Sequence, residues 1–267
     1  MTVSLDSRLS GTAGESRQRL LRGLARAGGF IGKMARNPLT AIGGGIIFLL
    51  LVVAIFAPLI APYNPLVQDL SNALSAPSAQ HWFGTDEFGR DIFSRLVYGA
   101  RITLYIVLLV SVTVGPLGLL LGVCAGYFGG KVDALIMRFA DVQLSFPSML
   151  IALFLMSMLG RSITNILLSL MLVGWVRYAR TVRGETLRVK KCEYIEATHV
   201  IGLPNWRILY KHVLPNVFAS IVVLSTIQVG GFILTEATLS FLGLGVQPPA
   251  AEWGDMLGRG RNELFRA

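Results

Sequence analysis

Long runs without charged residues constrain the fold of this chain more than any other feature of its sequence. Residues 41–62, 102–130 and 212–235 contain no Asp, Glu, Lys or Arg. A helix rises about 1.5 Å per residue, so about 20 apolar residues cross a hydrocarbon core about 30 Å thick. Each run is long enough to do so. We therefore expect an all-α, multi-pass protein of the lipid bilayer.

Composition supports a membrane protein and argues against other classes. Of 267 residues, 53% are hydrophobic and only 15% are charged, which is too apolar for an ordinary soluble domain. The net charge of +9 could suggest a nucleic-acid partner, but the basic residues flank apolar runs without interleaved aromatic residues. No nucleic-acid partner is expected. Cys124 lies in an apolar run and Cys192 in a basic interval, so no disulfide is expected either.

The distribution of charge predicts the topology. A basic N-terminal tail orients the first helix with its N-terminus in the cytoplasm. The expected segments are a cytoplasmic tail at 1–37, a first transmembrane helix at 38–62, an extracytoplasmic segment with an interfacial helix at 63–100, and a core domain at 101–267. Five crossings are expected: the first helix, then 102–130, a third helix ending near Leu159, a short fourth at 162–176, and a fifth from His212.

Residues 177–215 form the most basic interval inside this apolar sequence. They contain eight Lys or Arg residues against three Glu residues. Four crossings would return the chain to the side on which it began, and the positive-inside bias gives the same side independently. This loop is therefore expected to be cytoplasmic.

Stop signals divide the basic loop into two short helices. A Gly-Leu-Pro sequence at 202–204 predicts that a first helix ends near Ile201, because glycine accepts the left-handed conformation and proline cannot continue a helix. Asn205 is expected to cap a second helix through Val213, and Pro215 to mark the next boundary. On the first helix one stripe at helical spacing calls for a partner surface: Tyr194, Ala197, Thr198 and Ile201.

These residues carry a resemblance to a known family. Glu196-Ala197-Thr198, followed by Gly202 and by Leu214-Pro215, resembles the cytoplasmic EAA loop of the permeases of ABC importers. Thr198 replaces the usual second alanine, and His212 stands where isoleucine is common. Neither change removes the glycine turn or the Leu-Pro end.

A second motif lies more than 100 residues earlier. Its Gly-Thr-Asp and Gly-Arg-Asp groups resemble a segment of the dipeptide and oligopeptide branch of the same permeases: Gly84, Thr85, Asp86, Gly89, Arg90 and Asp91. The two glycines have P-loop spacing, but Arg-Asp replaces the Lys-Ser/Thr that phosphate and magnesium need, so nucleotide binding is rejected. We expect a turn and a capped helix on the membrane surface, with contact to substrate or binding protein as the alternative.

The resemblance implies an ATP-driven importer of the bacterial inner membrane, with the type I permease fold. Its implied partners are a second homologous permease subunit, two cytoplasmic ATPase subunits and an extracytoplasmic solute-binding protein. The implied cargo is a di- or oligopeptide, with nickel, glutathione or an opine-like solute as alternatives. A sixth helix would follow the Pro-Pro-x-x-Glu-Trp-Gly loop at 248–254 and is expected to be missing here. The implied ATPase-coupling residues are Tyr194, Glu196, Ala197, Thr198, Ile201, Gly202, Leu203, Pro204, Leu214 and Pro215.

The sequence contains no motif that would make or break covalent bonds. It lacks H-E-x-x-H, C-x-x-C, G-x-S-x-G and an intact P-loop, so no catalytic residue, cofactor or metal is expected and the chain is not expected to be an enzyme. Glu236 interrupts the fifth apolar run, where it has either a structural hydrogen-bonding role or a pathway or gating role. An ion-coupled secondary transporter would need inverted repeats and several membrane acids, and neither is found.

Overall fold

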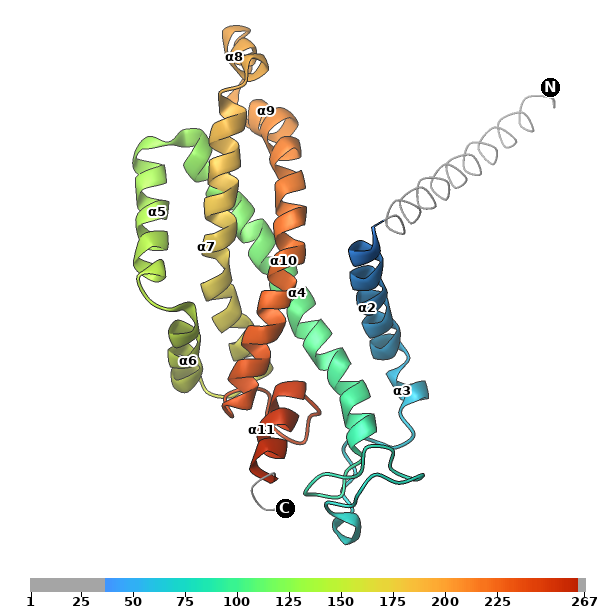
Figure 1. The fold of residues 1–267 in the computed structure, drawn as a ribbon. Coiled ribbons are helices and arrows are strands. Elements are labelled where there is room, and N and C mark those ends of the chain that lie inside the picture. The colour runs from blue at the N-terminus through green and yellow to red at the C-terminus, as the bar shows by residue number, and fades with distance from the viewer. Residues whose placement is uncertain (1–36, 264–267) are drawn as a thin grey trace, which may run out of the picture. The chain divides into compact units, whose positions relative to one another are not determined.

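The computed structural model describes residues 37–263 of the chain, which are mostly helical (Figure 1). Their only β pairing is an isolated bridge between Thr85 and Asp91. The chain divides into two compact units, residues 1–53 and 54–267. The expected N-terminal tail lies outside the described residues, except for Asn37.

Helix α2 (Pro38–Ile55) carries the first apolar run. Its large side chains, such as Leu39 and Phe48, are exposed, as expected of a helix that faces lipid. The predicted helix to residue 62 was too long: the chain bends at Phe56, and a separate short helix, α3 (Ala57–Ile60), follows. Pro58 explains the break, because proline has no N–H and clashes with the carbonyl four residues earlier in a helix.

Residues 61–91 are mostly turns, with one 3₁₀ turn, η1 (Leu70–Asn72). The expected interfacial helix does not form as a separate element. Instead α4 (Ile92–Phe128) begins directly after Asp91, whose carboxylate accepts from the Ser94 N–H at 2.7 Å. Nothing breaks the helix between its cap and the second apolar run, so the two are continuous.

The predicted third crossing is broken in the middle. It consists of α5 (Gly130–Leu144) and α6 (Ser148–Leu159), whose axes differ by 85°. Pro147 lies at the bend, and the residue before a proline avoids the helical conformation. The pair is therefore a broken span or a re-entrant loop, not one straight helix.

The remaining helices are α7 (Ile163–Lys190), α8 (Glu193–Val200), α9 (Asn205–Ile208), the π turn η2 (Leu209–Val213), α10 (Leu214–Phe241) and α11 (Trp253–Glu263). Within the described residues, 38–55, 92–128 and 205–241 are long and apolar enough to cross a membrane, and the bent pair can make a fourth span. α7 is not among them. The five-span count therefore stays a prediction.

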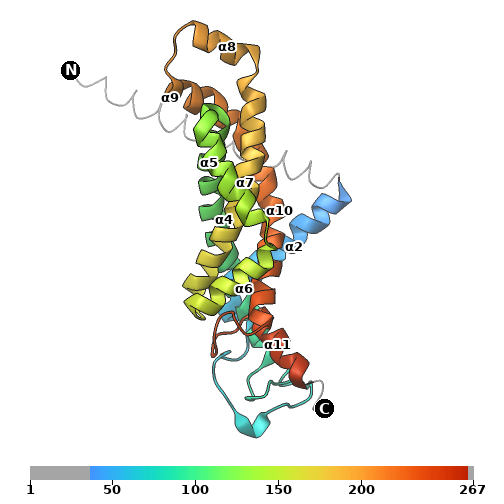
Figure 2. The same cartoon turned by 90° about the vertical axis from the view of Figure 1, so that its left-hand side faces the viewer.

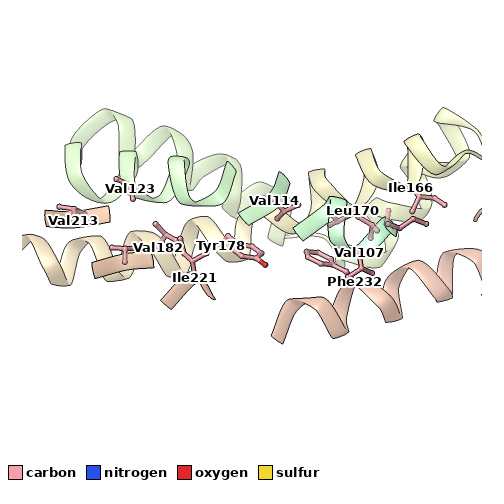
Figure 3. Close-up of a cluster of buried hydrophobic side chains, with 14 of the residues drawn as sticks. Val107, Val114, Val123, Ile166, Leu170, Tyr178, Val182, Val213, Ile221 and Phe232 are labelled. Atoms are coloured by element: carbon pink, nitrogen blue, oxygen red, sulfur yellow. The ribbon is translucent and has the colours of Figure 1, made fainter. Parts of the chain in front are cut away.

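Helices α4, α7 and α10 pack together around the core of the second unit (Figure 3). Glycines on α4 face α7 at every fourth residue: a Cβ on Gly118 would overlap Tyr178, and a Cβ on Gly122 would lie 2.6 Å from that of Val182. Small residues at this spacing let helix backbones approach closely, which drives helix association in lipid.

Candidate functional site

The two short helices of the basic loop lie at one end of the second unit. Both views place α8 beyond the end of α7 and α9 beside that end, with α11 at the opposite end (Figures 1 and 2). The loop therefore lies away from most of the packed core, and another protein can reach it there.

The predicted end of the first helix is confirmed. α8 ends at Val200, and Gly202 has φ +81°, in the left-handed region that favours glycine. The Gly202 N–H donates to the His199 carbonyl at 3.0 Å, and the Leu203 N–H donates to the Thr198 carbonyl at 3.1 Å. These two bonds fix the direction in which the chain leaves α8.

The prediction of a second short helix from Asn205 through Val213 was wrong in two respects. Asn205 does not cap it: Pro204 precedes the first turn, and the Asn205 side chain instead accepts a hydrogen bond from the Tyr127 hydroxyl at 3.0 Å. Nor does Pro215 end it, because α9, η2 and α10 run on as one apolar helix from Asn205 to Phe241. The π turn shifts the hydrogen-bond register so that Pro215 falls in the first turn of α10, where its missing N–H is tolerated.

The predicted stripe on α8 is mostly exposed. Tyr194 and Ala197 are exposed, and Ile201, just past the helix, is 77% exposed. Thr198 does not share that surface: it is 8% exposed, and its hydroxyl donates to the Ile195 carbonyl at 2.6 Å. Ile195 and Thr198, at i and i+3, form the buried side of the helix.

More exposed apolar side chains follow on the same loop. Val200, Trp206 and Tyr210 are 87%, 64% and 73% exposed, and sequence reasoning did not single them out. Their signal was available, because they are large apolar residues in a basic interval. We call Tyr194, Val200, Ile201, Trp206 and Tyr210 the apolar knuckle.

Charged residues lie next to the apolar knuckle in the sequence, and hydrogen bonds anchor its loop to the core. Glu196 is exposed, and among the described residues it has no ion-pair partner. Lys190, at the end of α7, donates to the Tyr127 carbonyl at 2.8 Å. Tyr127 therefore binds both sides of the loop, through its carbonyl and through its hydroxyl. A force on the loop would reach α4 through this residue.

The remaining predicted coupling residues lie where the chain enters and leaves α9 and η2: Leu203, Pro204, Leu214 and Pro215. Leu203 is half-buried against the core, and Pro204 is exposed at the start of α9. Leu214 and Pro215 lie at the start of α10. They shape the loop and its exit, whereas the apolar knuckle presents side chains outward.

The second motif, residues 84–91, lies near the opposite end of the unit. Its side chains mostly form hydrogen bonds within their own segment. The Asp86 carboxylate accepts from the Phe88 and Arg90 N–H groups at 2.9 Å and from the Arg90 Nε at 2.7 Å. Asp91 caps α4 and contacts the His81 ring at 2.9 Å. Gly84 and Gly89 have φ +73° and +71°, and Thr85 pairs with Asp91 across a bridge. This geometry supports the structural interpretation of the motif.

Two arginines tie the same segment to the C-terminal part of the chain. Arg95, 1% exposed, donates to the carbonyls of Pro65 at 3.0 Å and of Pro249 at 3.3 Å. Arg259 on α11 bonds Glu87 at 2.9 Å. Although burial lowers the pKa of the Arg259 guanidinium, its bonds to Glu87 and Asp255 outweigh that effect and raise the pKa above its usual value.

Glu236 is fully buried beside Glu252. Neither of its carboxylate oxygens has a hydrogen-bond partner in the described part of the chain. Glu252 caps α11 by accepting from the N–H groups of Gly254 at 2.7 Å and Asp255 at 2.8 Å. Within residues 37–263, no group of three His, Cys, Asp or Glu side chains could hold a metal ion.

Comparison with known proteins gives consistent similarities. Residues 118–260 match the family described as binding-protein-dependent transport system inner membrane component, and residues 29–77 match the N-terminal TM domain of oligopeptide transport permease C. The chain is 41% identical to the probable D,D-dipeptide transport system permease protein DdpC of Escherichia coli, over 86% of this chain and 77% of the relative.

Two further relatives show the same level of similarity. The dipeptide transport system permease protein DppC of Alkalihalophilus pseudofirmus is 42% identical, over 88% of this chain and 77% of the relative. The glutathione transport system permease protein GsiD of Pectobacterium atrosepticum is 39% identical, over 88% of this chain and 78% of the relative.

Proposed function

This chain belongs to the binding-protein-dependent transport system inner membrane component family, as a peptide ABC permease, and we propose from that premise how it acts. With a homologous permease subunit it forms the pathway for di- and oligopeptides. Two separate ATPase subunits drive it through the α8 loop, and a solute-binding protein delivers the peptide on the other side of the membrane. Its relatives are transport permease subunits and not enzymes.

The apolar knuckle is the observation that carries the proposal. Large side chains such as Val200 at the end of α8 and Trp206 on α9 are exposed. A group of exposed apolar side chains, with basic residues and the unpaired carboxylate of Glu196 close by in the sequence, fits an interface with another protein better than a solvated loop. In this proposal the ATPase subunit binds the knuckle, so the α8 end is cytoplasmic and the N-terminus is on the same side.

The loop is also built to pass a displacement on to the spans. Its exit continues into α10 without a break, and Tyr127 of α4 holds both the end of α7 and the start of α9. The Gly202 turn fixes the angle between α8 and α9. A movement of α8 would therefore shift α4, α7 and α10 together, which is the rigid-body motion that alternating access requires.

Peptide as the cargo rests on the relatives, whose names give D,D-dipeptide, dipeptide and glutathione. All three are peptides with a free carboxylate. Family membership sets aside the alternative of an ion-coupled secondary transporter. The expected direction of transport is inward, because the family is dependent on a binding protein.

A docking variant tests the coupling proposal. Ile201→Glu places a charge in the apolar knuckle, whereas Leu257→Glu places one on another exposed apolar residue, on α11 at the other end of the unit. We expect Ile201→Glu to lose the ATPase subunits during purification and to lose uptake, and Leu257→Glu to retain the ATPase subunits. Retention of the ATPase subunits by Ile201→Glu, with uptake at the wild-type rate, would overturn the proposal.

A further inference from the structure

A polar cavity lies in the second unit where the bent pair α5–α6 meets α7 and α10. Its volume is about 340 Å³, within the usual range for small-molecule sites. Its polar lining includes Gln143, Arg177 and Gln228, and its apolar lining includes Phe146 and Phe232. The 85° bend between α5 and α6 borders the cavity, since Phe146 and Ser148 flank Pro147 on either side of the bend.

Arg177 differs from the other arginines of α7. Arg180 is paired with Asp141, Arg183 with Asp133 and Arg188 with Glu185. Arg177 has no carboxylate partner among the described residues, and its one hydrogen bond is a long contact of 3.4 Å from a guanidinium nitrogen to the Gln228 side-chain oxygen. The cavity therefore contains a cation whose counter-charge the described chain does not supply.

The position of the Arg177 guanidinium, level with the middle of α10, argues that this charge has a function. Gln228, which Arg177 contacts, lies near the middle of α10, in a helix apolar enough to cross the membrane. A charged side chain at that depth is costly to keep in lipid and characteristically faces a pathway or binds a partner. The sequence analysis made residue 177 the start of the basic interval, whereas in the structure Arg177 lies within α7 and lines the cavity.

The lining is also held in shape for a ligand. Gln143 donates to the Val173 carbonyl at 3.1 Å and accepts from the Trp175 indole at 3.0 Å, so both ends of its amide are occupied. Gln143 therefore fixes the end of α5 against α7 next to the cavity. Gln228 is nearly buried and has only the weak Arg177 contact recorded for its oxygen. A better acceptor could displace that contact at little cost.

We propose that Arg177 binds the terminal carboxylate of the peptide during its passage, an inference that rests on the proposed function. The guanidinium presents a planar fork that matches a carboxylate, and a charge-assisted hydrogen bond of this kind is stronger than one between neutral groups. The aromatic rings of Phe146 and Phe232 line the same cavity and would contact an apolar side chain of the peptide. The ligand class is thus a small peptide-like solute with a free carboxylate.

Labelling of the cavity tests this directly in the assembled complex. Ser148 lines the cavity and is exposed, so a Ser148→Cys variant, with Cys124 and Cys192 replaced by serine, can report its occupancy through the rate of thiol labelling. A dipeptide with a free carboxylate is expected to slow labelling, and the same dipeptide with a C-terminal amide is not. Adding Arg177→Gln should weaken the protection by about tenfold in peptide concentration, and Arg177→Lys should retain part of it.

Arg161→Gln is the matched control, because Arg161 is exposed just before α7, outside the cavity lining, with no carboxylate partner in the described part of the chain. It should leave the protection unchanged. Equal protection by the free and the amidated dipeptide, or protection that survives Arg177→Gln, would overturn the inference. So would loss of the second permease subunit from the Arg177→Gln complex, since it would assign the arginine to the subunit interface.

Failure of this inference and failure of the proposed function give different results. If the wild-type complex takes up the dipeptide but the dipeptide never slows labelling, the carboxylate site is overturned and the proposed function stands. If the wild-type complex takes up no peptide with its binding protein and ATP, the proposed function fails, and the inference that rests on it fails with it.

Discussion

The hydroxyl of Tyr127 donates a hydrogen bond to the side-chain oxygen of Asn205, 3.0 Å away, and so joins the last turn of α4 to the first residue of α9. The two residues are 78 positions apart in the sequence. The same tyrosine accepts a bond from Lys190 through its carbonyl. The loop that carries the apolar knuckle is thus tied to α4, one of the three helices that pack around the core.

Removal of the hydrogen bond between Tyr127 and Asn205 should weaken the coupling of ATP hydrolysis to peptide uptake without unfolding the protein. In Tyr127→Phe the ring remains and one hydrogen bond is lost, which costs about 0.5–1.5 kcal/mol. We expect more ATP to be hydrolysed for each peptide taken up, measured in proteoliposomes that contain the whole complex. Tyr105→Phe is the control, because Tyr105 lies exposed on the same helix and no hydrogen bond of its hydroxyl is recorded in the described part of the chain. An unchanged ratio in Tyr127→Phe would show that the bond transmits nothing.

The Gly202 turn should tolerate no side chain with a branched Cβ. Gly202→Val places such a residue at φ +81°, which costs about 1–2 kcal/mol or more. No atom lies within 4 Å of the added Cβ, so the effect is one of backbone direction and not of crowding. ATP hydrolysis should continue while uptake falls.

Gly184→Val provides the matched comparison for that turn. Gly184 also has open space around its Cβ position, but it lies inside α7 with ordinary helical geometry. This substitution should leave the ratio of uptake to ATP hydrolysis near the wild-type value. An equal fall in the ratio of uptake to ATP hydrolysis in Gly202→Val and Gly184→Val would show that the Gly202 turn has no special role.

The contact between α4 and α7 should be sensitive to a single added side chain. A Cβ on Gly122 would lie 2.5 Å from the Ala179 carbonyl oxygen and 2.6 Å from the Val182 Cβ. Gly122→Val should destabilise the protein by about 1–3 kcal/mol, the usual cost of overpacking. Gly115→Ala, whose Cβ would lie 3.8 Å from the Tyr178 ring, should be nearly neutral. Thermal unfolding of the purified complex measures both, and a stable Gly122→Val protein would contradict the close packing.

The Asp86 carboxylate should matter more than any other acid of its segment. It accepts from Arg90 at 2.7 Å and lies 3.5 Å from Arg95, and both arginines are 1% exposed. Asp86→Asn leaves these buried cations without their main counter-charge, and loss of one partner of a buried pair costs about 3–5 kcal/mol. Asp69→Asn should cost far less, because its carboxylate is exposed. The unfolding temperatures of the two variants give the comparison.

Local sequence signals predicted the parts of the fold that local chemistry decides. The end of α8 at a left-handed glycine and the end of α4 near Gly129 both follow from the conformational freedom of glycine. The effects of two prolines differ from what the sequence predicted, because each depends on what surrounds it. Pro215 is absorbed because a π turn precedes it, and Pro147 bends a run that is apolar enough to look like one span.

Contacts between segments that are distant in the chain could not be predicted from the sequence. Arg138 and Asp141 are three residues apart and could have paired, but Asp141 pairs with Arg180 on α7 instead. The cavity around Arg177 has the same origin, because Gln143 and Gln228 reach it from helices far apart in the sequence. Spacing along a chain shows which residues share a helix face, but it does not show which helix that face meets.

The most direct test of the account is a photo-crosslinking residue in place of Val200, which is 87% exposed on the apolar knuckle. The buried Ile195 of the same helix is the control position. In the assembled complex under ATP, the account predicts that the probe at position 200 forms its adduct with an ATPase subunit and that the probe at position 195 does not. An adduct with the extracytoplasmic binding protein, or none with any ATPase subunit, would contradict it.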